Sequence, residues 1–220
     1  MISGNKKWYL VSGVLLILGA VTFIGWKSGK KAVNKQAAYT LSKDEYTKWL
    51  QNNATKIDEV KSSKEFGDIV VTLNYVPAEK RALREAGSST APGFEAALDE
   101  ARKFLTYQLK INHKDGLDVL NTQSEMYRDY ESRVKYFSFG IQRKLYLTVG
   151  AKRIPCALMH FERTFGLGKE LMLNLAFDSK EIPETEESPV LTWEDDFFGI
   201  GKINLSIGKN EINTLPQIKS

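Results

Sequence analysis

Cysteine is nearly absent from this sequence, since Cys156 is the only one among 220 residues. A single thiol excludes an intramolecular disulfide framework and a zinc site made of four thiolates. No disulfide partner is therefore required. We expect the roughly 180 residues that resemble a compact domain to be stabilised by a hydrophobic core without covalent cross-links.

The part of the chain after residue 35 lacks an excess of positive charge. The whole chain has a net charge of +4, but six lysines and no acidic residue lie in residues 1–35. This leaves 25 basic and 27 acidic residues in residues 36–220. Because neutralisation of phosphates needs a clustered positive surface, we expect no nucleic-acid partner.

Charged side chains are absent from residues 8–26, WYLVSGVLLILGAVTFIGW. At a rise of 1.5 Å per residue this stretch covers about 28 Å, close to the thickness of a bilayer core. Aromatic residues lie at both ends, as is typical of the headgroup boundary. The pattern predicts one transmembrane helix, preceded by a short basic tail (1–7) and followed by a basic juxtamembrane stalk (27–40). The lipid bilayer is thus a predicted partner.

The orientation of this segment rests on two opposing signals. Its end, TFIGWKSGKK, offers no small-residue pair for cleavage, which favours an uncleaved signal anchor. Two lysines precede it and four follow closely, and this count favours a cytoplasmic domain. A short basic tail before an apolar run is, however, typical of exported chains. We expect residues 41–220 to be extracytoplasmic, in the periplasm or outside the cell, and the lysine count leaves the cytoplasmic orientation open.

Helix and strand signals alternate in the first half of residues 41–220. Ser42 and Glu45 have the spacing of a capping box and predict the start of a helix. Alternating apolar residues predict a strand within residues 67–77. Proline and glycine then bracket a predicted helix at residues 78–86, and apolar residues at helical spacing predict another at residues 94–105.

The second half of the domain is richer in strand signals. A polar helix is predicted at residues 124–134, and the strongest hairpin at residues 135–163, broken by GAKR. Further strands are predicted at residues 170–177, 190–193 and 203–207. The predicted fold class is α+β: a single N-terminal transmembrane helix followed by one mainly antiparallel, sandwich-like β domain with several helices.

Two short groups of polar residues are the candidates for a metal site. His160 and Glu162 alternate along a predicted strand, so both side chains face one side and are ligand types that zinc accepts. Glu194, Asp195 and Asp196 supply adjacent carboxylates, although the ligand spacing of an EF-hand is absent. An ordinary polar pair and a solvated turn are the favoured interpretations. We therefore assign no catalytic, cofactor-binding or metal site, and predict no cofactor.

Two further motifs have simple structural interpretations. Cys156 is predicted to be a packed thiol, because His160 would lie about 13 Å away along a strand, too far to activate it. The pentapeptides FGLGK at residues 165–169 and FGIGK at residues 198–202 precede strands. Phosphate-binding glycine loops instead open helices, so these are predicted to be turns.

These observations predict a role rather than a reaction. We expect a membrane-anchored, non-enzymatic protein whose extracytoplasmic domain is a scaffold or accessory subunit of an envelope complex, with other envelope proteins as partners. Two alternatives stay open. A membrane-tethered, hydrolase-like enzyme requires His160, Glu162 and the acids of residues 194–196 to meet in one cleft. A small-ligand or lipid-binding domain requires a cavity, which we expect between the sheets.

Overall fold

The computed structural model describes residues 39–121, 128–162 and 169–219. Segment 8–26, the basic tail and nearly all of the stalk lie outside these ranges. Within them, no helix is long and apolar enough to cross a membrane. The longest, α1 (Lys43–Glu59), carries charged residues along its length and buries only Tyr46 and Ile57. We therefore correct the predicted fold class: the part that the structure describes is an α+β domain with several mostly antiparallel sheets and no membrane-spanning helix.

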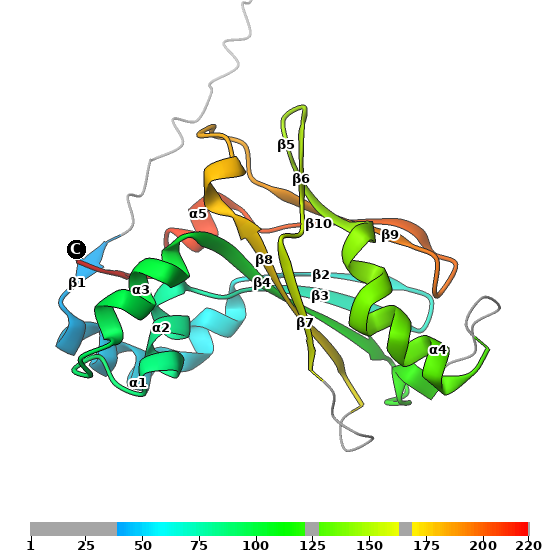
Figure 1. The fold of residues 1–220 in the computed structure, drawn as a ribbon, viewed down its shortest axis with the longest axis horizontal. Coiled ribbons are helices and arrows are strands. Elements are labelled where there is room, and N and C mark those ends of the chain that lie inside the picture. The colour runs from blue at the N-terminus through cyan, green and yellow to red at the C-terminus, as the bar shows by residue number, and fades with distance from the viewer. Residues whose placement is uncertain (1–38, 122–127, 163–168, 220) are drawn as a thin grey trace, which may run out of the picture. The chain divides into compact units, whose positions relative to one another are not determined.

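Three sheets organise this domain (Figure 1). The largest is antiparallel, with the order β2 (Lys61–Phe66), β3 (Ile69–Tyr75), β4 (Phe104–His113), β8 (Leu171–Asp178) and β7 (Leu158–Glu162). The second, also antiparallel, has the order β10 (Gly201–Ser206), β9 (Val190–Asp195), β5 (Leu145–Val149) and β6 (Lys152–Pro155). A short parallel pair joins β1 (Thr40–Leu41) to β11 (Gln217–Ile218).

The two antiparallel sheets share one hydrophobic core. Val71 and Leu73 of β3 are buried in it together with Leu147 of β5 and Trp193 of β9. Because side chains alternate between the faces of a strand, the even-numbered residues of β3, β4 and β8 face away from this core. The outer face of the five-stranded sheet is therefore available for polar side chains.

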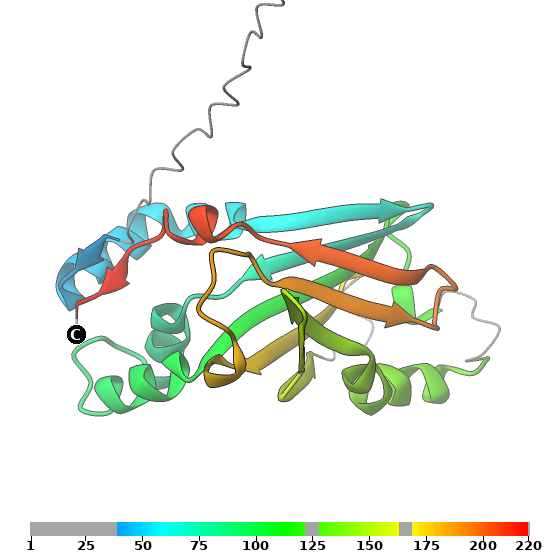
Figure 2. The same ribbon diagram turned by 90° about the horizontal axis from the view of Figure 1, so that it is seen from above.

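Three helices lie together at one end of the five-stranded sheet (Figure 2). They are α1, α2 (Ala78–Ala86) and α3 (Phe94–Arg102). Tyr46, Ala82 and Phe94 meet in a second, smaller apolar cluster that includes Ile218 near the carboxyl end. The helices thereby hold the chain terminus and cover part of the outer face of the sheet.

Several local predictions are confirmed in detail. Ser42 and Glu45 form the capping box, with the Ser42 backbone N–H donating to Glu45 Oε2 at 2.8 Å. The predicted helix at residues 78–86 has the observed bounds and ends at Gly87, whose φ of 78° is left-handed and favours glycine. In the motif at residues 198–202, residues 198–200 form the predicted turn and the last two residues begin β10. The other copy of this motif lies mostly outside the described residues.

Two segments differ from the prediction. The helix predicted to reach residue 105 ends at Arg102, and β4 begins two residues later. In the predicted hairpin at 135–163, residues 136–144 are helical and follow the short α4 (Tyr130–Lys135). The aromatic rings of Tyr136 and Phe137 pack against Phe197, and this tertiary packing overrides their preference for strands.

The remaining hairpin is short and is followed by a change of sheet. β5 and β6 pair around a turn at Gly150, where φ is 56°. The chain then leaves the four-stranded sheet, and β7 pairs with β8 at the edge of the five-stranded sheet. This crossing decides where His160 and Glu162 lie.

Candidate functional site

His160 and Glu162 lie on the same face of β7, as predicted. Glu162 Oε1 accepts a hydrogen bond of 2.5 Å from Asn174 Nδ2, while His160 lies opposite Asn174 in the strand register and is exposed. Among the described residues, no group of three or more His, Cys, Asp or Glu side chains is positioned to hold a metal ion. The pair is a polar feature of the outer sheet face.

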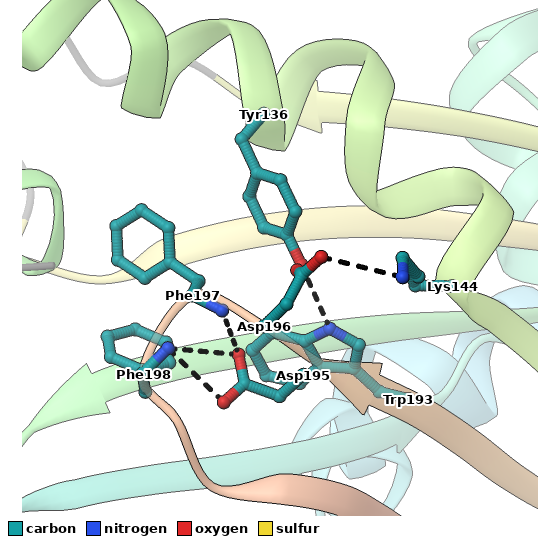
Figure 3. A network of polar contacts seen from close by, with 7 residues as sticks. All are labelled: Tyr136, Lys144, Trp193, Asp195, Asp196, Phe197 and Phe198. Atoms are coloured by element: carbon teal, nitrogen blue, oxygen red, sulfur yellow. Dashed lines mark hydrogen bonds and ion pairs between the residues drawn. The ribbon is translucent and has the colours of Figure 1, made fainter. Parts of the chain in front are cut away.

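Asp195 stabilises the turn between β9 and β10 (Figure 3). Its carboxylate is buried and accepts hydrogen bonds from the backbone N–H groups of Phe197 at 2.9 Å and Ile200 at 2.8 Å. The N–H of Phe198 also donates to it, at 3.1 Å. These amides occupy the carboxylate, so its role in the structure is to hold the turn.

Glu194 and Asp196 point to different partners. Glu194 Oε1 accepts a hydrogen bond of 2.9 Å from the Tyr146 hydroxyl and lies 3.7 Å from Arg153 Nη1. Asp196 Oδ2 lies 3.5 Å from Lys144 Nζ (Figure 3). The three neighbouring acids therefore have three separate sets of contacts.

Tyr136 and Trp193 form a further buried contact beside this turn (Figure 3). Trp193 Nε1 donates a hydrogen bond of 3.4 Å to the Tyr136 hydroxyl. Burial raises the pKa of Tyr136, and the carboxylate of Asp196 adds to the rise. The phenol thus stays protonated and links the helical segment at 136–140 to β9.

Cys156 is the packed thiol that the sequence predicts. It is buried, and its Sγ donates to the backbone oxygen of Leu158 at 3.2 Å. Burial raises the pKa of Cys156 to about 11. A thiol with so small a thiolate fraction is a poor nucleophile at neutral pH.

A pocket that the sequence did not predict lies on the outer face of the five-stranded sheet, beside α2. Its volume is about 530 Å³. Asn74, Gln108, Asn174 and His160 form a row across β3, β4, β8 and β7, because each is the register partner of the next. All four line the pocket. None of the acids of residues 194–196 is among its lining residues, so the cleft required by the hydrolase hypothesis is not formed here.

The amides in this row differ in their hydrogen bonding. Gln108 Nε2 donates to Asn174 Oδ1 at 3.2 Å, and Asn174 in turn donates to Glu162. Asn74 Nδ2 is buried and has no hydrogen-bond partner within residues 39–121, 128–162 and 169–219. Leaving a buried donor unpaired costs about 1–3 kcal/mol. Because the Nδ2 atom itself is buried, an acceptor in the pocket reaches it only when the Asn74 side chain turns.

Helix α2 adds three cationic side chains to the pocket: Lys80, Arg81 and Arg84. Arg81 Nη1 donates to Thr106 Oγ1 at 2.8 Å, which fixes the guanidinium against the sheet. Burial lowers the pKa of Arg81, and the positive charge of Arg84 lowers it further. Lys80 Nζ lies 3.8 Å from Asp58 Oδ1, a weak and exposed pair.

The sequence contains the parts of this pocket but not their assembly. Lys80, Arg81 and Arg84 are visible as cations on one short predicted helix. The amides of residues 74, 108 and 174 come from three distant strands, and the sheet register alone brings them into one row. The sequence signal for these amides is a polar residue at alternate positions of each predicted strand.

Comparisons with known proteins add little to this geometry. No protein-family model and no curated protein matches the chain. A solved structure of a protein of unknown function from Burkholderia pseudomallei is similar with a TM-score of 0.39 and 13% sequence identity, over 80% of this chain and 94% of that chain. A similarity this distant supports no conclusion about fold or function.

Proposed function

We propose that this domain acts by binding a small molecule in the pocket between α2 and the outer face of the five-stranded sheet. One observation carries the proposal: the wall of a pocket of about 530 Å³ combines a row of strand amides with the Arg81 guanidinium, which Thr106 fixes against the sheet. Small-molecule sites typically measure about 300–1,000 Å³ and combine apolar walls with a few convergent polar groups. Val76, Leu158 and Ala176 supply apolar wall here.

This location differs from the one predicted from sequence for a ligand-binding domain. The expected cavity was between the sheets, where the described core is instead filled by buried aliphatic and aromatic side chains. The pocket forms outside, where α2 stands beside a polar sheet face. The proposed ligand is therefore one with polar groups to satisfy, rather than a wholly apolar molecule.

The test is to screen the full chain against a library of small metabolites by ligand-detected NMR, with pocket-filling variants as the filter. Ala176 is buried on the outer face of β8 and lines the pocket, so Ala176→Leu and Ala176→Trp fill it progressively. Met172→Trp is the matched control, because Met172 lies on the same face of the same strand but does not line the pocket. Genuine ligands lose binding progressively in the Ala176 variants and keep it in the control.

Two results would contradict this proposal. Ligands that bind the Ala176→Trp protein as tightly as the wild type occupy another surface. A library without any ligand for a correctly folded wild-type protein would leave the pocket without a binding role. Folding of each variant is checked by near-UV circular dichroism and by its thermal midpoint.

The scaffold or accessory role, the envelope partners and the extracytoplasmic location stay predictions from the sequence. A small-molecule pocket is compatible with each of them, since a ligand-binding domain can also be a subunit of a larger assembly. Co-purification of partners with the full chain, and protease accessibility of a carboxyl-terminal tag in cells with an opened outer barrier, are the measurements that decide them.

A further inference from the structure

We infer that the ligand of this pocket is an amphipathic oxyanion: a carboxylate or phosphate group bound by Arg81 and Arg84, with a carbon chain lying along Leu158 and Ala176. This inference rests on the proposed function and adds the chemical class of the ligand. Four features of the pocket support it: its charge, the geometry of its hydrogen-bond donors, an unpaired amide and an exposed apolar surface.

The charge balance of the pocket favours an anion. Lys80, Arg81 and Arg84 line it, and Asp58 is the one acid among its described lining residues. Asp58 does not pair with either arginine; its Oδ1 atom lies 3.8 Å from Lys80 Nζ. Neither arginine forms an ion pair with the described residues, and the carboxylate of Glu85, which does not line the pocket, only partly offsets their mutual repulsion at Arg81. An anion bound in the pocket relieves this repulsion.

The donor geometry favours an oxyanion with two or more oxygens. Arg81 uses Nη1 for Thr106 and for the backbone oxygen of Ala101, at 2.8 and 3.3 Å. Its Nη2 and Nε groups make no hydrogen bond to the described residues. A guanidinium that is fixed on one side presents a planar pair of donors on the other, and this arrangement matches a carboxylate or phosphate.

Asn74 supplies a further donor in the same pocket. Its Nδ2 group is neutral, buried and without a partner among the described residues, so a turn of this side chain toward an oxygen in the pocket recovers a hydrogen bond which the free protein lacks. Carboxylate and phosphate oxygens accept from amide and guanidinium donors alike. The pocket therefore has more hydrogen-bond donors than a single hydroxyl oxygen of a ligand can accept.

The apolar wall favours a ligand with a carbon chain. Leu158 lines the pocket with 58% of its surface exposed, so it offers apolar area that a ligand can cover. Ala176, its register partner on β8, and Val76 extend this surface. Covering exposed apolar area is favourable in proportion to the area covered, so a ligand with a carbon chain gains affinity that a bare inorganic anion does not.

The test uses isothermal titration calorimetry of the full chain with four probes: octanoate, octyl phosphate, octanamide and inorganic phosphate. We expect octanoate, octyl phosphate or both to bind about tenfold more tightly than octanamide, and octyl phosphate to bind more tightly than inorganic phosphate. A preference between octanoate and octyl phosphate identifies which oxyanion the site selects. The affinity for the charged probes should fall in high salt, because the arginines are partly exposed.

A matched pair of variants assigns the charge effect to the pocket. Arg84→Gln removes an exposed arginine that has no hydrogen bond or ion pair with the described residues, so its loss leaves the fold intact. It should weaken the charged probes about threefold to tenfold and leave octanamide unchanged. Arg143→Gln removes an arginine that is also exposed and outside the pocket, and should bind every probe as the wild type does.

Three outcomes would overturn the inference. Equal affinity for octanoate and octanamide would show that the site does not select an anion. An equal loss of affinity for the charged probes in Arg84→Gln and Arg143→Gln would show that they do not bind in this pocket. Absence of binding by all four probes to the wild type removes the amphipathic oxyanion itself. The library screen tests the proposed function separately from this inference. If the screen finds only neutral ligands, and the Ala176 variants lose them, the pocket binds small molecules but its ligand is not an oxyanion.

Discussion

The most informative single substitution is Asn74→Leu, because it should make the free protein more stable and the pocket less able to bind. Asn74 faces outward from β3, and its Nδ2 group is buried without a partner in the part of the chain that the structure describes. Leucine has the same branched shape with the same number of non-hydrogen atoms, is somewhat larger and has no polar atom, and the open pocket beside residue 74 accommodates the added volume. The substitution therefore removes an unmet hydrogen bond without removing a bond that exists.

The expected gain in the free energy of unfolding is about 1–2 kcal/mol. An unpaired buried donor costs about 1–3 kcal/mol, and the lower part of this range applies because the residue as a whole is half-buried. Asparagine is also depleted in strands relative to apolar residues, on a scale that spans about 1 kcal/mol. For a domain of this size each kcal/mol raises the melting temperature by about 2–4 °C.

Urea unfolding followed by tryptophan fluorescence measures this gain, since Trp193 is buried in the shared core and reports its loss. Asn112→Leu is the matched control on the neighbouring strand β4. Asn112 Nδ2 donates to Glu170 Oε1 at 2.9 Å, so leucine there removes an existing bond. The control protein should be no more stable than the wild type.

The reasoning is refuted if Asn74→Leu lowers the free energy of unfolding, or if it raises that free energy no more than Asn112→Leu does. Either result would mean that the Asn74 amide is satisfied in the free protein. Asn74→Leu should also weaken the binding of octanoate. If the variant keeps full affinity, the Asn74 amide does not contribute to ligand binding.

Three further substitutions test other parts of the structure. Glu79→Gln should lower the free energy of unfolding by about 2 kcal/mol, because the buried Glu79 carboxylate lies 3.3 Å from Arg102 Nη2 and loses its charge; an unchanged urea midpoint would show that this pair does not hold the carboxyl-terminal strand. Burial raises the pKa of Cys156 to about 11, so the stability that its protonated thiol contributes is present below its ordinary pKa of 9.0 and is lost as the pH rises toward 11. Cys156→Ala should therefore lose less stability than the wild type between pH 9 and 11. Parallel plots of unfolding free energy against pH for the two proteins would contradict the raised pKa. Asp195→Asn should cost about 1–3 kcal/mol, since a neutral amide oxygen is a weaker acceptor for the backbone N–H groups of the turn, and amide hydrogen exchange of Phe198 that stays as slow as in the wild type would show that the carboxylate is dispensable there.

Local structure in this protein follows closely from local sequence. The capping box of Ser42 and Glu45, and the helix between Pro77 and Gly87, were predictable because each depends on hydrogen bonds or dihedral angles within a few residues. The strand β3 was predictable because its alternation between apolar and polar side chains directly reports one buried face.

Predictions that depended on distant residues were less successful. Residues 136–144 contain aromatic and branched residues typical of strands, yet they are helical because Tyr136 and Phe137 pack against Phe197, about 60 positions away. The predicted transmembrane part of the fold class has no counterpart in the described helices, which are short or polar along their length.

The sequence by itself determined the chain's short-range features: the helix ends, the alternation of strands, the packed thiol of Cys156 and the near-neutral charge of the folded part. Tertiary structure alone decided the pocket. Asn74, Gln108 and Asn174 lie far apart in the sequence and become neighbours only through the pairing of β3, β4 and β8. The physical reason is that strand register depends on the burial of the opposite face, so polar residues on the outer face are aligned by contacts in which they take no part.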